Sequence, residues 1–142
     1  MTEKAVHIAE SEGKSMIVFH DDENCLSYEQ LQSVCKEGIA SNSSIYAGNL
    51  LFGKPHAKGG AQIANDGKSF AKYFDGGLYV LSVDLARSIV DDEDTVLAYM
   101  YFPHLDDVTI GHWVKKQNED PARGKRVSYV QKKSLMWVVQ KG

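Results

Sequence analysis

Short apolar runs alternate with helical patterns along this chain, and that alternation limits its fold more than any other feature. Apolar runs of strand length occupy five segments: residues 15–20, 45–52, 78–82, 127–130 and 135–139. Helical patterns occupy three segments: residues 28–35, 83–90 and 106–116. Strands that alternate with helices in this way predict an α/β fold.

Local signals refine several of these predictions. Ser27 is a suitable N-cap for the helix predicted over 28–35. The helix predicted over 106–116 begins with acids and ends with lysines, which suits the helix dipole. Residues 53–69 are rich in glycine and lysine and predict a long loop. The two late apolar runs are candidates for a hairpin across residues 131–134.

Length and charge bound the classes of function. A chain of 142 residues fits one domain, and its net charge of −3 gives no general case for binding nucleic acid. Charge is uneven, however, because residues 115–142 hold eight Lys or Arg side chains against two acids. This asymmetry indicates a solvated basic tail or a surface for an anionic ligand or partner, and we favour the tail.

Cysteine content and hydropathy constrain the chain's surroundings. Cys25 and Cys35 are too few for a disulfide-built scaffold, and one bridge or two free thiols fit the sequence equally well. No apolar stretch is long enough to span a membrane, and the first residues lack the apolar region of a signal peptide. We therefore expect a soluble chain.

Three consecutive acids, Asp21, Asp22 and Glu23, follow directly after the first predicted strand. Side chains alternate along a strand, so Asp21 and Glu23 would share one side and Asp22 would face the other. Carboxylate oxygens suit Mg²⁺ or Mn²⁺, which usually takes one or two carboxylates together with phosphate oxygens. A solvated polar strand end is the simpler interpretation, so the triplet alone does not establish a metal site.

A pair of glycines, Gly76 and Gly77, stands before the strand predicted over 78–82. Paired glycines permit unusual backbone angles and a close approach of a ligand to the backbone. The neighbouring aromatic residues either stack on a sugar ring or simply pack in the core: Tyr73, Phe74 and Tyr79. Taken alone, this segment is more typical of a turn before a core strand.

The third candidate segment begins with Asp106 and Asp107, at the start of a predicted helix. Acids in the first turn are most often capping residues. A carboxylate that faces a cleft can instead act as a general base and take a proton from an attacking hydroxyl. His112 and Trp113 lie about one turn further along, where a histidine is more often packed or solvated than catalytic.

The order of these motifs resembles one family, the inverting β-1,3-galactosyltransferases of glycosyltransferase family 31, which include Fringe-type N-acetylglucosaminyltransferases. The resemblance rests on the acidic triplet, on YAGN at 46–49, on GGLYVLSVDLA at 76–86 and on DDVTIG at 106–111. It covers roughly residues 15–116. The glycine segment and the DDVTIG motif are specific as a pair, although neither is specific alone.

The resemblance implies a GT-A-like mixed sheet flanked by helices, and the transfer of galactose or N-acetylglucosamine from a UDP-sugar to a glycan hydroxyl with inversion. Mn²⁺ or Mg²⁺ would lie on the donor diphosphate and would be held by Asp21, Asp22 and Glu23. Asp107 would be the general base. The remaining residues expected to bind substrate are Asp106, Gly76, Gly77, Tyr79, Tyr73, His112 and Trp113. The family also implies a Golgi location, although the chain as written has no anchor.

Family members carry further strands, which hold the uridine, before the acidic triplet. We therefore expect residues 1–142 to form a single domain that matches the C-terminal part of the catalytic domain, with a core over 15–116 and a basic tail over 117–142. A partner chain would then supply the nucleotide-binding half. Two alternatives stay open: a non-catalytic remnant that binds sugar or protein, and a small α/β domain whose acidic turns bind nothing.

Overall fold

A four-stranded mixed sheet lies at the centre of the computed structural model, which describes residues 3–21, 23–52, 71–75, 77–92 and 106–138. The elements are α1 (Glu3–Ser11), β1 (Met16–His20), β2 (Asn24–Leu26), α2 (Tyr28–Ser41), β3 (Ser44–Gly48), β4 (Leu51–Phe52), β5 (Tyr73–Phe74), β6 (Leu78–Ser82), α3 (Val83–Asp91), α5 (Asp106–Glu119), the 3₁₀ helix η2 (Pro121–Arg123), β7 (Val127–Gln131) and β8 (Met136–Val138). The predicted α/β fold is confirmed.

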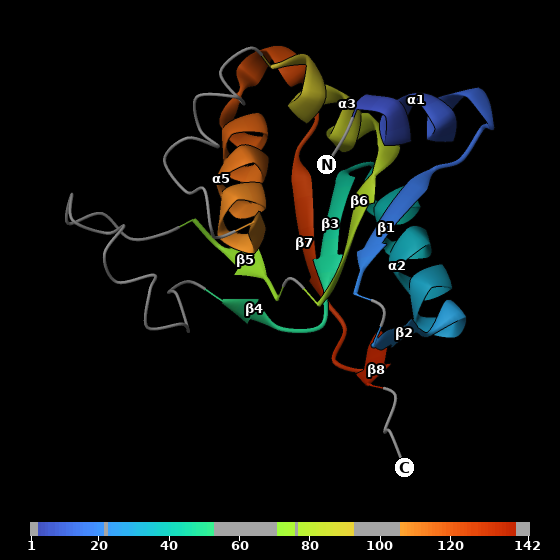
Figure 1. Ribbon diagram of the computed structural model, residues 1–142. Helices are drawn as coiled ribbons and strands as arrows, with labels where there is room; N and C mark the ends of the chain where they lie inside the picture. Colours follow the sequence, from blue (N-terminus) through green and yellow to red (C-terminus); the bar gives the residue numbers. More distant parts are fainter. Residues whose placement is uncertain (1–2, 22, 53–70, 76, 93–105, 139–142) are drawn as a thin grey trace.

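Strands follow the order β1-β6-β3-β7 in the central sheet (Figure 1). β6 runs antiparallel to both β1 and β3, whereas β3 and β7 run parallel. β3 and β6 are buried along their whole length because helices cover both faces of the sheet. One face packs against residues of α1, α3 and α5, and the other packs against α2.

Several local predictions are confirmed. The strand over 78–82 agrees with β6, and the run over 15–20 contains β1. The helix capped by Ser27 extends to Ser41, and the Ser27 Oγ accepts a hydrogen bond from the Gln30 amide at 3.3 Å. α3 and α5 match the two later helices, with α5 extending to Glu119. The run over 45–52 divides into β3 and β4.

Other features differ from the prediction. The late hairpin is wrong, because β7 pairs with β3 and β8 pairs with β2. The short elements α1, β2 and β5 were not predicted. The loop predicted over 53–69, and the end of the run over 135–139, lie outside the described residues.

Cys25 and Cys35 are both free thiols, and no helix in the described ranges is long and apolar enough to cross a membrane.

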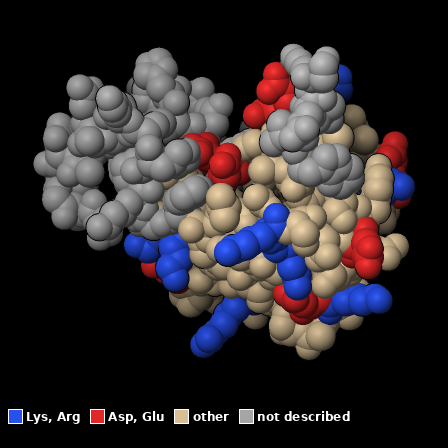
Figure 2. All heavy atoms as spheres, turned by 90° about the horizontal axis from the view of Figure 1, so that it is seen from below, with Lys and Arg blue, Asp and Glu red and all other residues tan. Residues whose placement is uncertain are grey.

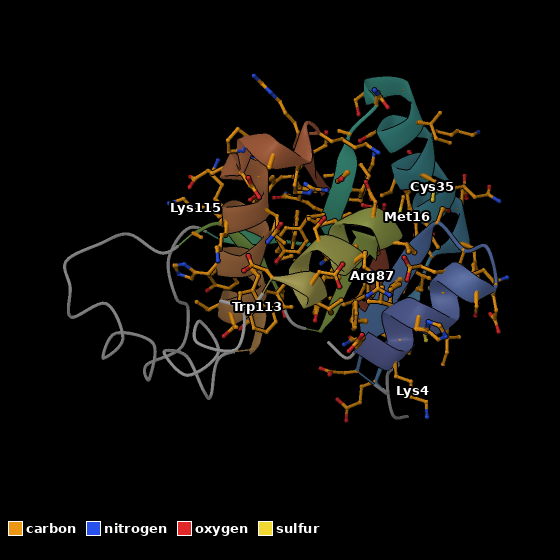
Figure 3. The ribbon with its side chains drawn as sticks, turned by 90° about the horizontal axis from the view of Figure 1, so that it is seen from above. Lys4, Met16, Cys35, Arg87, Trp113 and Lys115 are labelled. Carbon is orange, nitrogen blue, oxygen red and sulfur yellow. The ribbon has the colours of Figure 1, made fainter. Side chains whose placement is uncertain are left out.

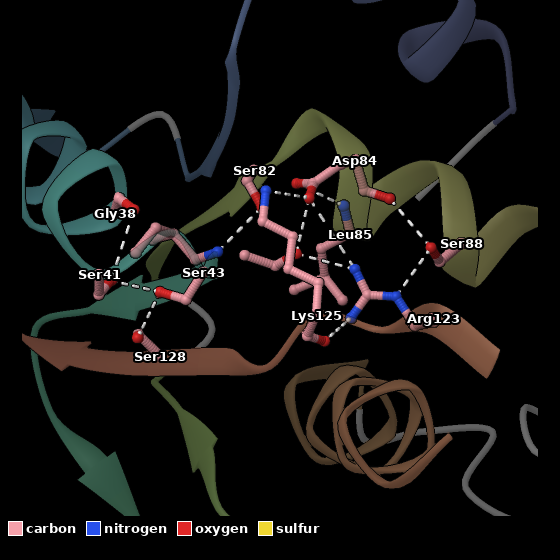
Figure 4. Close-up of polar contacts among 12 residues, drawn as sticks. Gly38, Ser41, Ser43, Ser82, Asp84, Leu85, Ser88, Arg123, Lys125 and Ser128 are labelled. Atoms are coloured by element: carbon pink, nitrogen blue, oxygen red, sulfur yellow. Dashed lines mark hydrogen bonds and ion pairs between the residues drawn. The ribbon is translucent and has the colours of Figure 1, made fainter. Parts of the chain in front are cut away.

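The basic C-terminal segment supplies β7 and two cations of a partly buried ionic cluster centred on Asp84 of α3 (Figure 4). Asp84 Oδ2 accepts hydrogen bonds from Ser44 Oγ at 2.7 Å and from Lys125 Nζ at 3.1 Å. Arg123, whose side chain is only 9% exposed, donates from Nη2 to Ser44 Oγ at 2.8 Å and from Nε to Ser88 Oγ at 3.1 Å. The Asp84 cluster therefore ties η2 and the approach to β7 onto α3 and β3.

Protonation of Asp84 is strongly disfavoured in this setting. Burial raises the pKa of its carboxyl, but hydrogen bonds from Ser82, Ser44 and Lys125 outweigh that effect and lower the pKa to about 2. The carboxylate is therefore charged at neutral pH and holds its donors in place. The Asp84 cluster thus stabilises this end of the sheet, and the acidic motifs lie at the opposite end.

Candidate functional site

The acidic segment lies in the turn after β1, beside the start of β6. The strand register sets His20 opposite Leu78, so the two segments that flank these residues meet at one end of the sheet. The Asp21 amide donates to the Gly77 carbonyl at 3.0 Å. Asp21 and Glu23 are exposed, and Asp22 lies outside the described residues. The structure thus brings the acidic turn and the glycine turn together.

Asn24 forms hydrogen bonds to both of these turns. Its side-chain Nδ2 donates to the Gly77 carbonyl at 2.8 Å, and its amide donates to the Asp21 carbonyl at 3.0 Å. A Cβ atom at Gly77 would stand 2.9 Å from Asn24 Nδ2, so a side chain at this position would require the Asn24 amide to shift. Sequence analysis missed Asn24, although its place directly after the acidic triplet was a usable signal.

Asp75 shapes the glycine turn from its other side. Its Oδ1 accepts a hydrogen bond from the Gly77 amide at 3.0 Å, the two-residue reach that is typical of an aspartate in a turn. The Asp75 amide donates to the Leu50 carbonyl at 3.0 Å, which ties the turn to the segment between β3 and β4. Gly76 lies outside the described residues. The DGG sequence was the signal that sequence analysis left unused.

The helix that begins with Asp106 and Asp107 packs closely on β5. A Cβ atom at Gly111 would stand 2.6 Å from the Lys72 carbonyl oxygen, so the last glycine of DDVTIG permits this contact. Asp107 is half-buried, and its Oδ1 accepts a hydrogen bond from the Val108 amide at 2.9 Å. Asp106 is the first residue of α5, and its side chain is not among the described parts of the chain. The close packing fixes where the first turn of α5 stands.

Tyr46 connects β5, on which α5 packs, with the central sheet. The Phe74 amide donates to the Tyr46 hydroxyl at 3.0 Å, and the two rings meet edge to face with centroids 4.8 Å apart. Burial raises the pKa of Tyr46 well above its ordinary value, and the charge of Asp107 adds to that effect. Tyr46 stays a neutral phenol, and sequence analysis did not assign it any role.

Gly48 makes room for the same arrangement, since a Cβ atom there would stand 2.5 Å from the ring of Phe74. β3 ends at this glycine, and its partner in the register is Tyr79 of β6. Tyr79 in turn stacks on Phe19 of β1, with ring centroids 4.9 Å apart. These contacts lead from the strand before the acidic turn to β5, at the lower end of the sheet in Figure 1.

The aromatic residues predicted to contact substrate are core residues in the structure. Tyr73 is fully buried, and Tyr79 and Trp113 are each 9% exposed. His112 is half-buried. Trp113 lies on α5 beside the other helices of its face (Figure 3). Contact of any of these side chains with a substrate stays a prediction.

The carboxylates of the acidic turn fit a hard divalent cation by their chemistry. Asp21 and Glu23 supply exposed oxygen donors, the type that Mn²⁺ and Mg²⁺ bind together with phosphate oxygens. Within the described ranges, which omit Asp22, no group of three His, Cys, Asp or Glu side chains is close enough to hold a metal ion. A cation here would therefore depend on Asp22 or on ligand oxygens as well.

Seen from below, the molecule shows acidic and basic side chains interspersed over its described surface (Figure 2).

A protein-family model described as galactosyltransferase matches residues 5–122, which is most of the chain. This span contains the acidic turn, the glycine turn and the first turn of α5. No curated protein matches the chain.

Proposed function

Because the chain belongs to the galactosyltransferase family, which uses a sugar-nucleotide donor and an acceptor, we propose that it transfers galactose or N-acetylglucosamine from a UDP-sugar to a glycan hydroxyl. The reaction would invert the configuration at the anomeric carbon. The observation that supports this proposal is the pair of hydrogen bonds from Asp21 and Asn24 to the Gly77 carbonyl, which brings the acidic turn against the glycine turn of the family motif. A Golgi site of action is part of the same proposal and rests on the family resemblance.

Asp107 is proposed as the general base. The acceptor oxygen attacks the anomeric carbon, the bond from that carbon to the diphosphate oxygen breaks, and the hydroxyl proton passes to the Asp107 carboxylate. UDP leaves with the electron pair of the broken bond. The hydrogen bond from the Val108 amide to Oδ1 holds the carboxylate in a fixed orientation, which supports this role.

Asp21, Asp22 and Glu23 are proposed to hold Mn²⁺ or Mg²⁺. When bound, such an ion neutralises the negative charge that develops on the leaving diphosphate. Asn24 acts as a positioning residue, because its two hydrogen bonds hold the acidic turn against Gly77. The fit of carboxylate oxygens to a hard cation supports the assignment.

The remaining predicted residues are proposed to line the donor and acceptor sites. The glycine turn would let the donor approach the backbone closely, since Gly76 and Gly77 carry no side chains. The set consists of Asp106, Gly76, Gly77, Tyr73, Tyr79, His112 and Trp113. Buried members of this set would act by supporting the cleft wall unless the site opens on binding. A partner chain that completes the nucleotide site belongs to the same proposal.

A transfer assay with Asp107→Asn tests the proposal. Asparagine retains an oxygen that accepts the Val108 hydrogen bond but is a far weaker base, so we expect transfer to fall by about 10²–10⁴-fold while the thermal midpoint stays unchanged. Asp91→Asn is the matched control, because Asp91 is 61% exposed at the end of α3 and pairs with Arg87. That variant should transfer normally.

Retention of full activity by Asp107→Asn would refute the assignment of the base. If the wild-type chain and the variant both fail to transfer but bind acceptor glycans equally well, the chain is a non-catalytic binding module instead. Titration of UDP with and without Mn²⁺ separates the donor site from the base, because binding should depend on the metal and should be lost in Glu23→Ala.

A further inference from the structure

β2 and β8 form a separate two-stranded ladder below the central sheet (Figure 1). β2 comprises three residues, and within the described ranges its only strand partner is β8. A pair of short strands has little stability of its own, so its place depends on what holds it to the rest of the fold. Asn24, which bonds to both turns of the candidate site, is the first residue of β2. The position of Asn24 therefore depends on β8.

Residues 132–138, which contain β8, are anchored to the core and to the end of β3. Leu135 is fully buried in the core cluster on the α2 side of the sheet, and its carbonyl accepts a hydrogen bond from the Ser27 amide at 2.8 Å. The Lys132 amide donates to the Gly48 carbonyl, at the end of β3, at 2.9 Å. The 132–138 segment is thus fixed to the core before it reaches β2.

The register of the ladder shows which amides hold β2 in place. Cys25 pairs with Trp137, and beyond the last pair the Ser27 amide still donates across the ladder. Bonded residues alternate with non-bonded ones along an antiparallel pair, so the amides of Cys25 and Trp137 point into the ladder. The amide of Asn24 points away from β8 and donates to the acidic turn instead, at the Asp21 carbonyl. β2 is therefore bonded to β8 on one side and to the acidic turn on the other.

We propose that the 132–138 segment positions the acidic turn for the metal and the donor diphosphate, and that it acts through Asn24. The inference rests on the proposed function, since it takes the acidic turn to be the site of the cation. Carboxylates that bind a metal are oriented by the residues behind them, and loss of such support usually lowers metal affinity by about 10–100-fold. Asn24 gives that support, and β8 fixes the strand on which Asn24 stands. The family match ends at residue 122, so this role is not part of what the match implies.

Titration of UDP in the presence of Mn²⁺ into two variants at one position tests the proposal. Trp137→Pro removes the amide that points into the ladder, whereas Trp137→Ala keeps it. Both variants lack the indole, so the comparison isolates the backbone pairing from the side chain. We expect the dissociation constant to be about 10-fold higher in Trp137→Pro than in Trp137→Ala.

Asn24→Ala separates a positioning role from a purely structural one, which is the alternative because Leu135 belongs to the core. If the 132–138 segment acts through Asn24, the difference in affinity between the two Trp137 variants should disappear when Asn24→Ala is added to each. A purely structural effect would remain in that background, since it does not depend on the Asn24 side chain.

Hydrogen exchange of the Asn24 side-chain amide, followed by NMR, needs neither metal nor donor. The hydrogen that bonds to the Gly77 carbonyl should exchange slowly in the wild type and in Trp137→Ala, and faster in Trp137→Pro. If the wild type fails to bind UDP with Mn²⁺, the proposed donor site is wrong. The exchange of Asn24 then decides by itself whether β8 positions this residue.

Equal UDP affinity in the two Trp137 variants would overturn the proposal. So would a difference that persists without the Asn24 side chain, or equal exchange of the Asn24 amide in both variants. Loss of folding in Trp137→Pro would overturn it as well, because the ladder would then be a requirement of the fold rather than a support for the acidic turn.

Discussion

Removal of the Arg123 guanidinium should destabilise the fold much more than removal of another arginine with acidic neighbours. Arg123 is 9% exposed and donates to Ser44, to Ser88 and, from Nη1 at 3.3 Å, to the Lys125 carbonyl. Its Nη2 also stands 4.0 Å from Asp84 Oδ2. Arg123→Ala therefore removes three hydrogen bonds and the buried cation from the Asp84 cluster.

The magnitude follows from these contacts. Two unit charges at 4.0 Å attract by roughly 4 kcal/mol at an effective dielectric constant of 20, and the value must be reduced because Asp84 is 42% exposed and retains Lys125. In the variant, Ser44 still donates to the Asp84 carboxylate and Ser88 still donates to the Asp84 carbonyl. The Lys125 carbonyl loses the hydrogen bond from Arg123. We expect Arg123→Ala to lower the free energy of unfolding by about 2–4 kcal/mol.

Urea denaturation measures this loss, and a thermal scan should show the midpoint falling by roughly 10 °C. Arg87→Ala is the control, because Arg87 pairs with Glu10 and Asp91 at the surface, where ion pairs contribute little. If the free energy of unfolding falls by less than about 1 kcal/mol in Arg123→Ala, or falls equally in the two variants, the reasoning that burial of Arg123 makes its contacts strongly stabilising is refuted.

Three further predictions concern single residues. The pKa of Asp84 is about 2 in the folded state against an ordinary 3.8, so its carboxylate stabilises the fold above about pH 4 and this stabilisation is lost as the pH falls toward 2. In Asp84→Asn the free energy of unfolding should therefore depend less on pH between about 4 and 2. An unchanged pH dependence in this variant would contradict the prediction. Gly111→Ala should cost about 1–3 kcal/mol in denaturation and should reduce transfer, because its Cβ would overlap the Lys72 carbonyl. Ser27→Ala should cost about 1 kcal/mol through loss of the α2 cap, with no effect on transfer per folded molecule.

Local sequence patterns predicted those helices and strands that are determined by the residues within them. β6 is a continuous apolar run and was located to the residue, and α2 was located from its helical spacing and from Ser27. The hairpin failed because β7 finds its partner in β3, a parallel pairing across the chain that no local pattern encodes. The β2–β8 and β4–β5 ladders are too short for a periodic signal.

The candidate site divides in the same way. The acids and glycines of the motifs were identifiable as residues, and the structure brings the acidic turn and Gly77 together through Asn24. Sequence analysis did not anticipate Asn24, Asp75 or Tyr46, since their roles depend on hydrogen bonds between distant segments. Nor could it anticipate that Tyr73 is fully buried, because aromatic residues suit a core and a sugar-binding surface equally well.

The parallel pairing of β3 with β7 also bears on how the molecule forms during synthesis. Ser44 pairs with Val127, so more than eighty residues must leave the ribosome before the inner strand β3 gains its second neighbour. Until then the nascent sheet consists of β1, β6 and β3, with one long side of β3 open to solvent. Contacts of such high sequence separation form slowly, so this open side is where a chaperone would be needed most during translation.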